Sequence, residues 1–91
     1  MIVRIATEGQ YELDEGLSAE VTELDNQVIA ACESDDETEF RAKFDRLLEL
    51  VRGGRKFRDD ELVGSDMILP PPDVSLKEAK AEFSGEGLIP G

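Results

Sequence analysis

The chain has 91 residues, of which 22 are acidic and 10 are Lys or Arg, so its formal net charge is −12. This length favours one small domain spanning residues 1–91. The negative charge repels phosphate backbones and anionic lipid headgroups, and no apolar run approaches the ~20 residues that a membrane span needs. The composition therefore argues against a nucleic-acid partner and against direct membrane insertion.

The residue inventory also limits the possible chemistry. The chain has no histidine and one cysteine, Cys32, so the commonest general base is missing and an internal disulfide is excluded. Its glycines do not form a phosphate-binding pattern. We therefore predict a protein that is not an enzyme, with no catalytic, cofactor-binding or metal-binding residues. A lone cysteine and a start without a long apolar stretch are typical of a cytoplasmic protein.

The charges are unevenly distributed along the chain. Residues 5–40 contain no Lys or Arg but twelve acids, and residues 41–58 contain seven bases against Asp45 and Glu49. One interpretation is that these are solvated helix faces that attract each other within the fold. The other is a dipolar surface that orients a charged partner.

The N-terminal residues predict a β-hairpin. Ile2–Ile5 is rich in β-branched residues, and an apolar alternation resumes at Tyr11–Leu13. Between them, Gly9 can adopt the positive φ that a tight turn requires. Two strands are marginally stable alone, so we expect the hairpin to pack against helices.

Two amphipathic helices follow. The first is predicted over residues 14–33 and the second after Ser34-Asp35, where Asp36 and Glu39 fit a capping box. Gly53-Gly54 ends the second helix. Because only two or three residues separate the helices, they should form an antiparallel hairpin. Their apolar stripes are Leu17, Val21, Leu24, Val28 and Ala31 in the first helix, and Phe40, Phe44, Leu47, Leu48 and Val51 in the second.

The last third of the chain predicts a loop, a strand and a short helix. Residues 53–64 are assigned to a polar loop, and a third short strand near residues 66–69 can pair with the hairpin. Three prolines end this strand. Ser75 and Glu78 then form a capping box for a helix that closes at Ser84-Gly85. The predicted fold class is α+β, with a β-hairpin packed on an antiparallel two-helix hairpin and a short C-terminal helix.

Two further segments have simple structural interpretations beside functional ones. RGGRKFR at Arg52–Arg58 is the basic cluster of the chain, and it could contact nucleic acid or lipid headgroups. A solvated loop flanked by acids explains it more simply. The prolines at Pro70–Pro72 could dock in an aromatic groove or serve as a rigid stop before the last helix.

Several motifs together resemble a known family. They are MIVRIATEGQYEL at Met1–Leu13, LDNQVIAA at Leu24–Ala31, LLELVR at Leu47–Arg52, DDELVGSDMILPPPD at Asp59–Asp73 and GEGLIPG at Gly85–Gly91. The chain resembles the PspA-associated protein family, PspAA. The resemblance implies a small non-enzymatic accessory of phage-shock protein A that acts by protein–protein interaction in the bacterial envelope stress response. It brings no catalytic residues.

The apolar segments near the C-terminus are the candidate partner-binding residues, with the acidic face of the first helix giving orientation. They are Ile68, Leu69 and Pro70, together with Leu88, Ile89 and Pro90. The alternative is that both segments complete the core of this domain. Two other functions stay open: a self-associating module that forms a homodimer, and a winged-helix-like regulator, which the charge disfavours. The expected location is the cytoplasm, either free or peripheral to the inner membrane through the partner.

Overall fold

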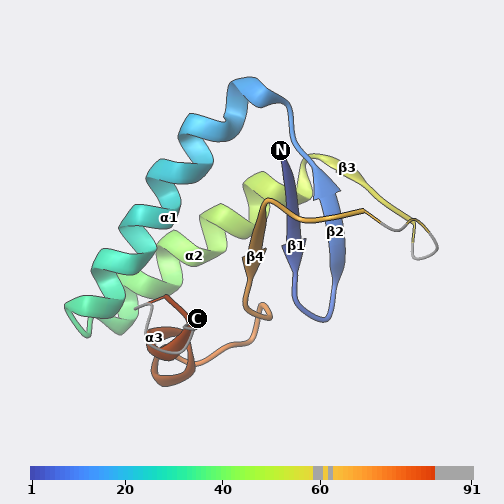
Figure 1. Cartoon of the computed structure of the whole chain (residues 1–91). Helices are drawn as coiled ribbons and strands as arrows, with labels where there is room; N and C mark the ends of the chain where they lie inside the picture. The colour runs from blue at the N-terminus through green and yellow to red at the C-terminus, as the bar shows by residue number, and fades with distance from the viewer. Residues whose placement is uncertain (59–60, 62, 84–91) are drawn as a thin grey trace.

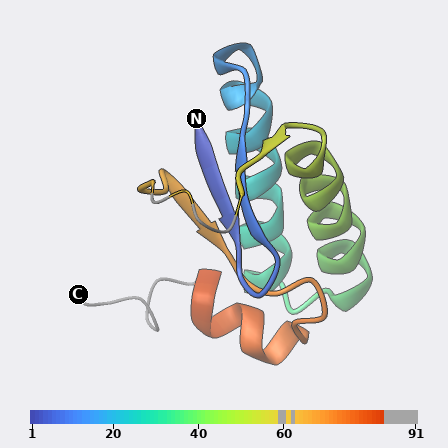
Figure 2. The same cartoon turned by 90° about the vertical axis from the view of Figure 1, so that its right-hand side faces the viewer.

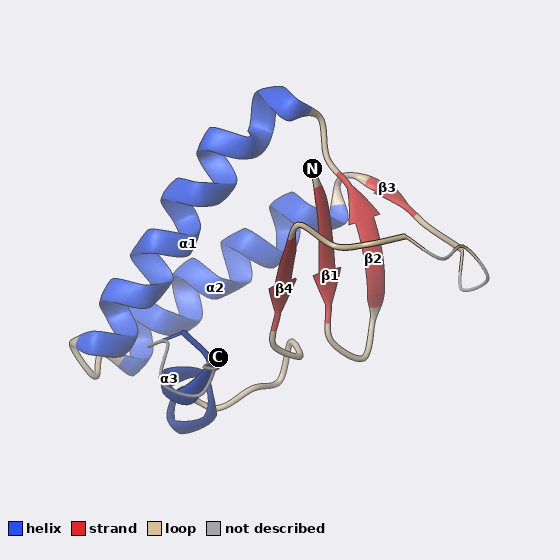
Figure 3. Ribbon diagram, in the orientation of Figure 1, coloured by secondary structure: helices blue, strands red, loops and turns tan. Residues whose placement is uncertain are grey.

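The computed structural model describes residues 1–58, 61 and 63–83. In this part of the chain a four-stranded sheet has the strand order β3-β2-β1-β4. Two long helices cover one face of the sheet, and a short third helix lies below the end of β4 (Figures 1 and 2). Figure 3 shows the resulting two layers, one of helices and one of strands. The α+β prediction is confirmed.

The N-terminal hairpin forms as predicted. Strand β1 (Ile2–Ile5) pairs antiparallel with β2 (Gly9–Glu12), from Ile2 opposite Glu12 to Ile5 opposite Gly9. Gly9 has a φ of +143°, which a residue with a Cβ rarely adopts. A Cβ at this position would also lie 3.2 Å from the Cε of Lys56. The turn therefore requires the glycine that the sequence provides.

The two amphipathic helices form the predicted antiparallel hairpin. Helix α1 spans Ser18–Glu33 and α2 spans Glu37–Arg52. The first helix does not begin at Asp14, because a separate 3-10 turn at Glu15–Leu17 precedes it, with the Asp14 side chain accepting from the N–H of Gly16. The Asp36 side chain caps α2 by accepting from the N–H of Glu39 at 3.1 Å.

Two short strands complete the sheet. Strand β4 (Met67–Leu69) pairs parallel with β1, which confirms the predicted third strand. Strand β3 (Arg55–Lys56) pairs antiparallel with β2, where the sequence analysis placed only a loop. Two charged residues carry no apolar alternation, so nothing local predicts a strand there. The N–H of Phe57 continues this pairing by donating to the carbonyl of Gln10 at 2.9 Å.

The chain that leads into β4 crosses the face of the sheet opposite the helices, in front of β2 and β1 (Figure 1). Buried Gln10 holds this crossing in place. Its amide donates to the carbonyl of Val63 at 3.0 Å and to the hydroxyl of Ser65 at 2.7 Å. The N–H of Asp66 then donates to the carbonyl of Ile2 at 2.7 Å and aligns β4 with β1.

Helix α3 (Leu76–Phe83) begins with the predicted capping box. The N–H of Glu78 donates to the Ser75 hydroxyl, and the N–H of Ser75 donates to the Glu78 carboxylate, both at 3.2 Å. Val74 and Ala79, on either side of this cap, are both buried. The residues buried in the core include Val3, Ile5, Val21, Val28, Phe40, Phe44, Leu47, Val51 and Leu69.

Candidate interaction surface

The structure separates the predicted partner-binding residues. Ile68 is 66% exposed, and it is the exposed large hydrophobic residue of the described part of the chain. Leu69 is 1% exposed and Pro70 is also buried, so neither is available to a partner in this conformation. Leu88, Ile89 and Pro90 lie outside the described residues. Side chains of a strand alternate between its two faces. Because all the residues of this run are apolar, the sequence did not indicate which of them is exposed.

Ile68 lies on an edge strand beside Arg4. The two residues are partners in the β1–β4 register, and both are exposed on the sheet face opposite the helices. Within residues 1–58, 61 and 63–83, the Arg4 side chain forms no ion pair. An apolar side chain and an unpaired guanidinium group therefore stand side by side at the edge of the sheet.

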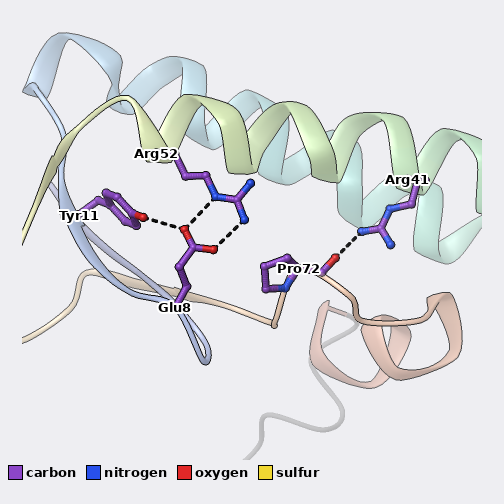
Figure 4. Close-up of polar contacts among 5 residues, drawn as sticks. All are labelled: Glu8, Tyr11, Arg41, Arg52 and Pro72. Atoms are coloured by element: carbon purple, nitrogen blue, oxygen red, sulfur yellow. Dashed lines mark hydrogen bonds and ion pairs between the residues drawn. The ribbon is translucent and has the colours of Figure 1, made fainter. Parts of the chain in front are cut away.

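Arg41 of α2 fixes residues 70–83, which we call the C-terminal arm. Its guanidinium donates to the carbonyl of Pro72 at 3.0 Å (Figure 4) and to the carbonyl of Val74 at 3.3 Å. The same group lies 5.4 Å from the ring centroid of Phe40 and 5.5 Å from that of Phe44. One side chain thus ties the arm to the helical layer.

A second contact holds the arm at its far end. The ammonium group of Lys80 donates to the Asp35 carboxylate at 3.0 Å, and this exposed ion pair joins α3 to the α1–α2 turn. Cys32 of α1 lies in the same region and is 1% exposed, and burial raises the pKa of its thiol. Helix α3 of the arm thus packs on the helix that carries this buried thiol.

Two bases of the basic stretch at residues 52–58 pair with acids of the N-terminal hairpin. Arg52 binds Glu8 through two hydrogen bonds, of 2.8 Å from Nε and 2.7 Å from Nη2, and the hydroxyl of Tyr11 donates to the same carboxylate at 2.7 Å (Figure 4). The hydrogen bonds from Arg52 and then Tyr11 lower the pKa of Glu8 to about 2. Burial, together with the bond to Glu8, raises the pKa of Tyr11.

Arg55 and Lys56, the next two bases of this stretch, also contact side chains of the fold. Arg55 lies 3.3 Å from the Glu12 carboxylate and stacks 4.4 Å from the ring centroid of Phe57. Lys56 lies 5.9 Å from the ring centroid of Tyr11. The acids of the hairpin, rather than those that follow the stretch in sequence, pair with Arg52 and Arg55. Sequence reasoning missed these partners because the residues are more than 40 positions apart.

The acidic residues of α1 have no such partners. Its four acids are Glu20, Glu23, Asp25 and Glu33, and none forms an ion pair with a base in the part of the chain that the structure describes. Asp25 is half-buried, and this burial raises the pKa of its carboxyl group. Within the described residues the acids of α1 therefore form no ion pair, whereas Arg52 and Arg55 of the basic stretch are both paired with acids.

Comparison with known proteins identifies the family. The family model of the PspA-Associated protein matches residues 1–91, which is the whole of this chain. The chain belongs to the PspA-Associated protein family. Searches of curated proteins and of solved structures gave no match. The family points to an association with phage-shock protein A.

No helix of the described residues is long and apolar enough to cross a membrane. Those residues also contain no group of three Asp, Glu, Cys or His side chains that could hold a metal ion. A cavity of about 380 Å³ lies over the outer sheet face, between Arg4, Gln10, Phe57 and Glu61.

The Glu8–Arg52 pair should make the stability of the fold sensitive to acid. Because the pKa of Glu8 is lowered from 4.5 to about 2, its contribution is present above pH ~4.5 and is lost as the pH falls towards 2. We expect Glu8→Gln to reduce the free energy of unfolding by about 1–2 kcal/mol at pH 7, after allowance for solvent screening of the exposed Arg52. Urea unfolding at pH 7, 4 and 2.5 measures this loss.

Glu12→Gln is the matched control, because it breaks an exposed hairpin pair with Arg55. It should change stability by no more than about 0.5 kcal/mol. The difference between wild type and Glu8→Gln should also shrink at pH 2.5. A Glu8→Gln effect that stays constant from pH 7 to 2.5 would contradict the assignment.

Proposed function

We propose that this chain is a small, non-enzymatic accessory that acts by binding phage-shock protein A in the envelope stress response. Membership of the PspA-Associated family supports the partner. The protein would work in the cytoplasm and reach the inner membrane only through that partner. In this proposal the chain acts as an adaptor, with the exposed Ile68 side chain and the acids of α1 as its binding features.

The observation that carries this proposal is the exposure of Ile68. The Ile68 side chain is 66% exposed. Full burial of such a side chain by a partner would favour binding by roughly 1.5–3 kcal/mol. It belongs to the SDMILPPPD segment, one of the motifs that carry the family resemblance. Leu69 and Pro70 hold Ile68 in place from the core side. We propose that Leu88, Ile89 and Pro90 extend the same apolar contact.

The unpaired acids of α1 would orient the partner. Glu20 and Glu23 are exposed and form no ion pair within the described residues, although Lys43 and Arg46 line the same surface hollow. Charges of this kind raise the association rate and select a complementary surface more than they add affinity. The complex should therefore rest on an apolar anchor at Ile68 and on salt-sensitive attraction along α1.

Isothermal titration against phage-shock protein A tests the anchor and the attraction separately. Ile68→Asp should weaken binding at least about tenfold, since a desolvated apolar anchor carries 1.4 kcal/mol or more. Thr38→Asp is its control, because it adds the same charge at an exposed position in the first turn of α2. Ile68→Thr, which keeps a β-branched side chain, should also weaken binding while the melting temperature changes little.

Raising the salt from about 0.05 to 0.3 M should weaken wild-type binding several-fold, because screening shortens the reach of surface charges. Glu20→Gln should reduce this salt effect, and Glu49→Gln on α2 should not. No binding by the wild type would remove the proposed function, and binding unaffected by salt would remove its electrostatic part. A stable dimer in sedimentation, without affinity for phage-shock protein A, would favour the self-associating module.

A further inference from the structure

Three features lie in one row across the outer face of the sheet, which is the face opposite the helices. In the strand registers, Ile68 of β4 lies beside Arg4 of β1, and Arg4 lies beside Gln10 of β2. Figure 1 shows these three strands side by side. The Ile68 side chain is exposed at one end of the row. At the other end lies the cavity of about 380 Å³, with Gln10, Phe57 and Val63 among its lining residues.

Arg4 is the cation in the middle of this row, and among the described residues its side chain forms no ion pair. Two acids lie near it, and each has a donor of its own. Glu61, which also lines the cavity, accepts from the N–H of Arg58 at 2.6 Å, and Asp66 accepts from the N–H of Ile2 at 2.8 Å. A guanidinium group matches a carboxylate because its N–H donors are fixed in one plane. The middle of the row is therefore suited to an Asp or Glu side chain.

The spacing of the row matches one face of an α-helix. Neighbouring strands lie about 4.8 Å apart, so the row from β4 to β2 spans roughly 10 Å. A helix rises by about 10.5 Å over seven residues, and its positions i, i+4 and i+7 lie on one face. A helix that crosses the three strands can thus place one side chain at each of the three features.

We propose that the outer face of the sheet receives an amphipathic helix of the partner, with an acidic residue in the middle of its apolar stripe. An apolar residue at i packs on Ile68, a Glu or Asp at i+4 binds Arg4, and an apolar residue at i+7 enters the cavity beside Gln10. This inference rests on the proposed function, and it specifies the kind of segment that contacts Ile68. The acids of α1, which lies behind the sheet, attract a different part of the partner.

Charge argues against two other occupants of this face. A symmetric dimer centred on the row would bring two Arg4 guanidinium groups together and would join two chains of net charge −12. The phosphates of a nucleic acid or a lipid surface would meet the same net negative charge. One carboxylate within an apolar stripe meets Arg4 without bringing further negative charge to the domain.

Titration calorimetry of the full chain with phage-shock protein A tests the contact at Arg4. We expect Arg4→Gln to weaken binding about tenfold, the usual loss for a hydrogen bond to a charged group, with an unchanged melting temperature. Lys77→Gln is the matched control, because it removes the same charge from an exposed base of α3 outside the row. Without either cation the long-range attraction of a basic surface to α1 becomes slightly stronger. Weaker binding of Arg4→Gln alone therefore identifies a local contact with an acid.

Nuclear magnetic resonance of the labelled chain during the same titration locates the helix on the sheet. The amide signals of Gly9 and Gln10, which lie beside the cavity, should shift or broaden together with that of Ile68. The amide of Asp45 on the exposed side of α2 is the internal reference and should keep its position.

Three results would overturn the inference while leaving the proposed function in place. The first is wild-type affinity in Arg4→Gln, and the second is an equal loss in Lys77→Gln, which would assign the effect to overall charge. The third is a titration that moves the signal of Ile68 but not those of Gly9 and Gln10, since the helix would then not cross the row. A wild type that does not bind phage-shock protein A at all would remove the proposed function and this inference together. A wild-type dimer that Arg4→Gln dissociates would assign the face to a second copy of the chain.

Discussion

Replacing Gly54 with alanine is expected to reduce the free energy of unfolding by about 2–3 kcal/mol, the typical effect of forcing extra atoms into a packed site. A Cβ at Gly54 would overlap the backbone carbonyl oxygen of Glu12 and would lie 2.6 Å from Cδ2 of Leu13. The first of these groups is backbone of the sheet and cannot rotate away. The chain would have to separate the end of α2 from β2, and β3 would lose its pairing with Glu12.

The control for this substitution is Gly64→Ala, because a Cβ at Gly64 meets no atom within 4 Å. It should change stability by less than about 0.5 kcal/mol, since alanine there affects mainly the unfolded chain. Thermal unfolding followed by circular dichroism should show a melting temperature about 10 °C lower for Gly54→Ala. Equal melting temperatures for the two variants would show that the close approach of Gly54 to Glu12 is not needed for the fold.

Gly54 also illustrates what the sequence can and cannot predict. The sequence analysis assigned Gly53-Gly54 only to the end of the second helix, a local role that glycine commonly has. The approach of Gly54 to β2 depends on how α2 crosses the sheet, which no local pattern encodes. The same holds for β3, because Arg55 and Lys56 become a strand only where β2 offers its edge.

The elements that were predicted correctly have local causes. The spacing of Val21, Leu24 and Val28 alone indicates a helix with one buried face. Ser75 and Glu78 identify the start of α3 because both partners of the cap lie within one turn. The long-range ion pair between Glu8 and Arg52 has no such local cause. The positions of Arg52 in the last turn of α2 and of Glu8 in the hairpin turn are consistent with the pair but do not predict it.

The candidate surface was predicted only in part for a related reason. Met67, Ile68 and Leu69 form a uniformly apolar run, so composition gives no indication of which side chain is exposed. The parallel register with β1 decides it, because Leu69 lies beside buried Ile5 and Ile68 beside exposed Arg4. The sequence analysis proposed residues 68–70 and 88–90 together as partner-binding residues because both segments are apolar. The structure shows that Leu69 and Pro70 are buried.

Replacing Arg41 with methionine is expected to release the C-terminal arm and to cost about 2 kcal/mol, the usual range for hydrogen bonds from a charged group. Methionine keeps an unbranched apolar stem near the rings of Phe40 and Phe44, so the loss should come mainly from the bonds to the carbonyls of Pro72 and Val74. Because α3 packs on α1, its release should expose Cys32. The rate at which a thiol reagent modifies Cys32 under native conditions should rise about thirtyfold, which corresponds to a local opening that is easier by about 2 kcal/mol.

Arg46→Met is the matched control for Arg41→Met, because Arg46 is exposed on the same helix and contacts none of the groups that hold the arm. It should change neither the thiol rate nor the stability by a measurable amount. The thiol rate separates release of the arm from global unfolding, since it should rise at denaturant concentrations where the circular dichroism of both variants is still native. If Arg41→Met lowered stability but left Cys32 as protected as in the wild type, Arg41 would stabilise the helical layer rather than hold the arm on it.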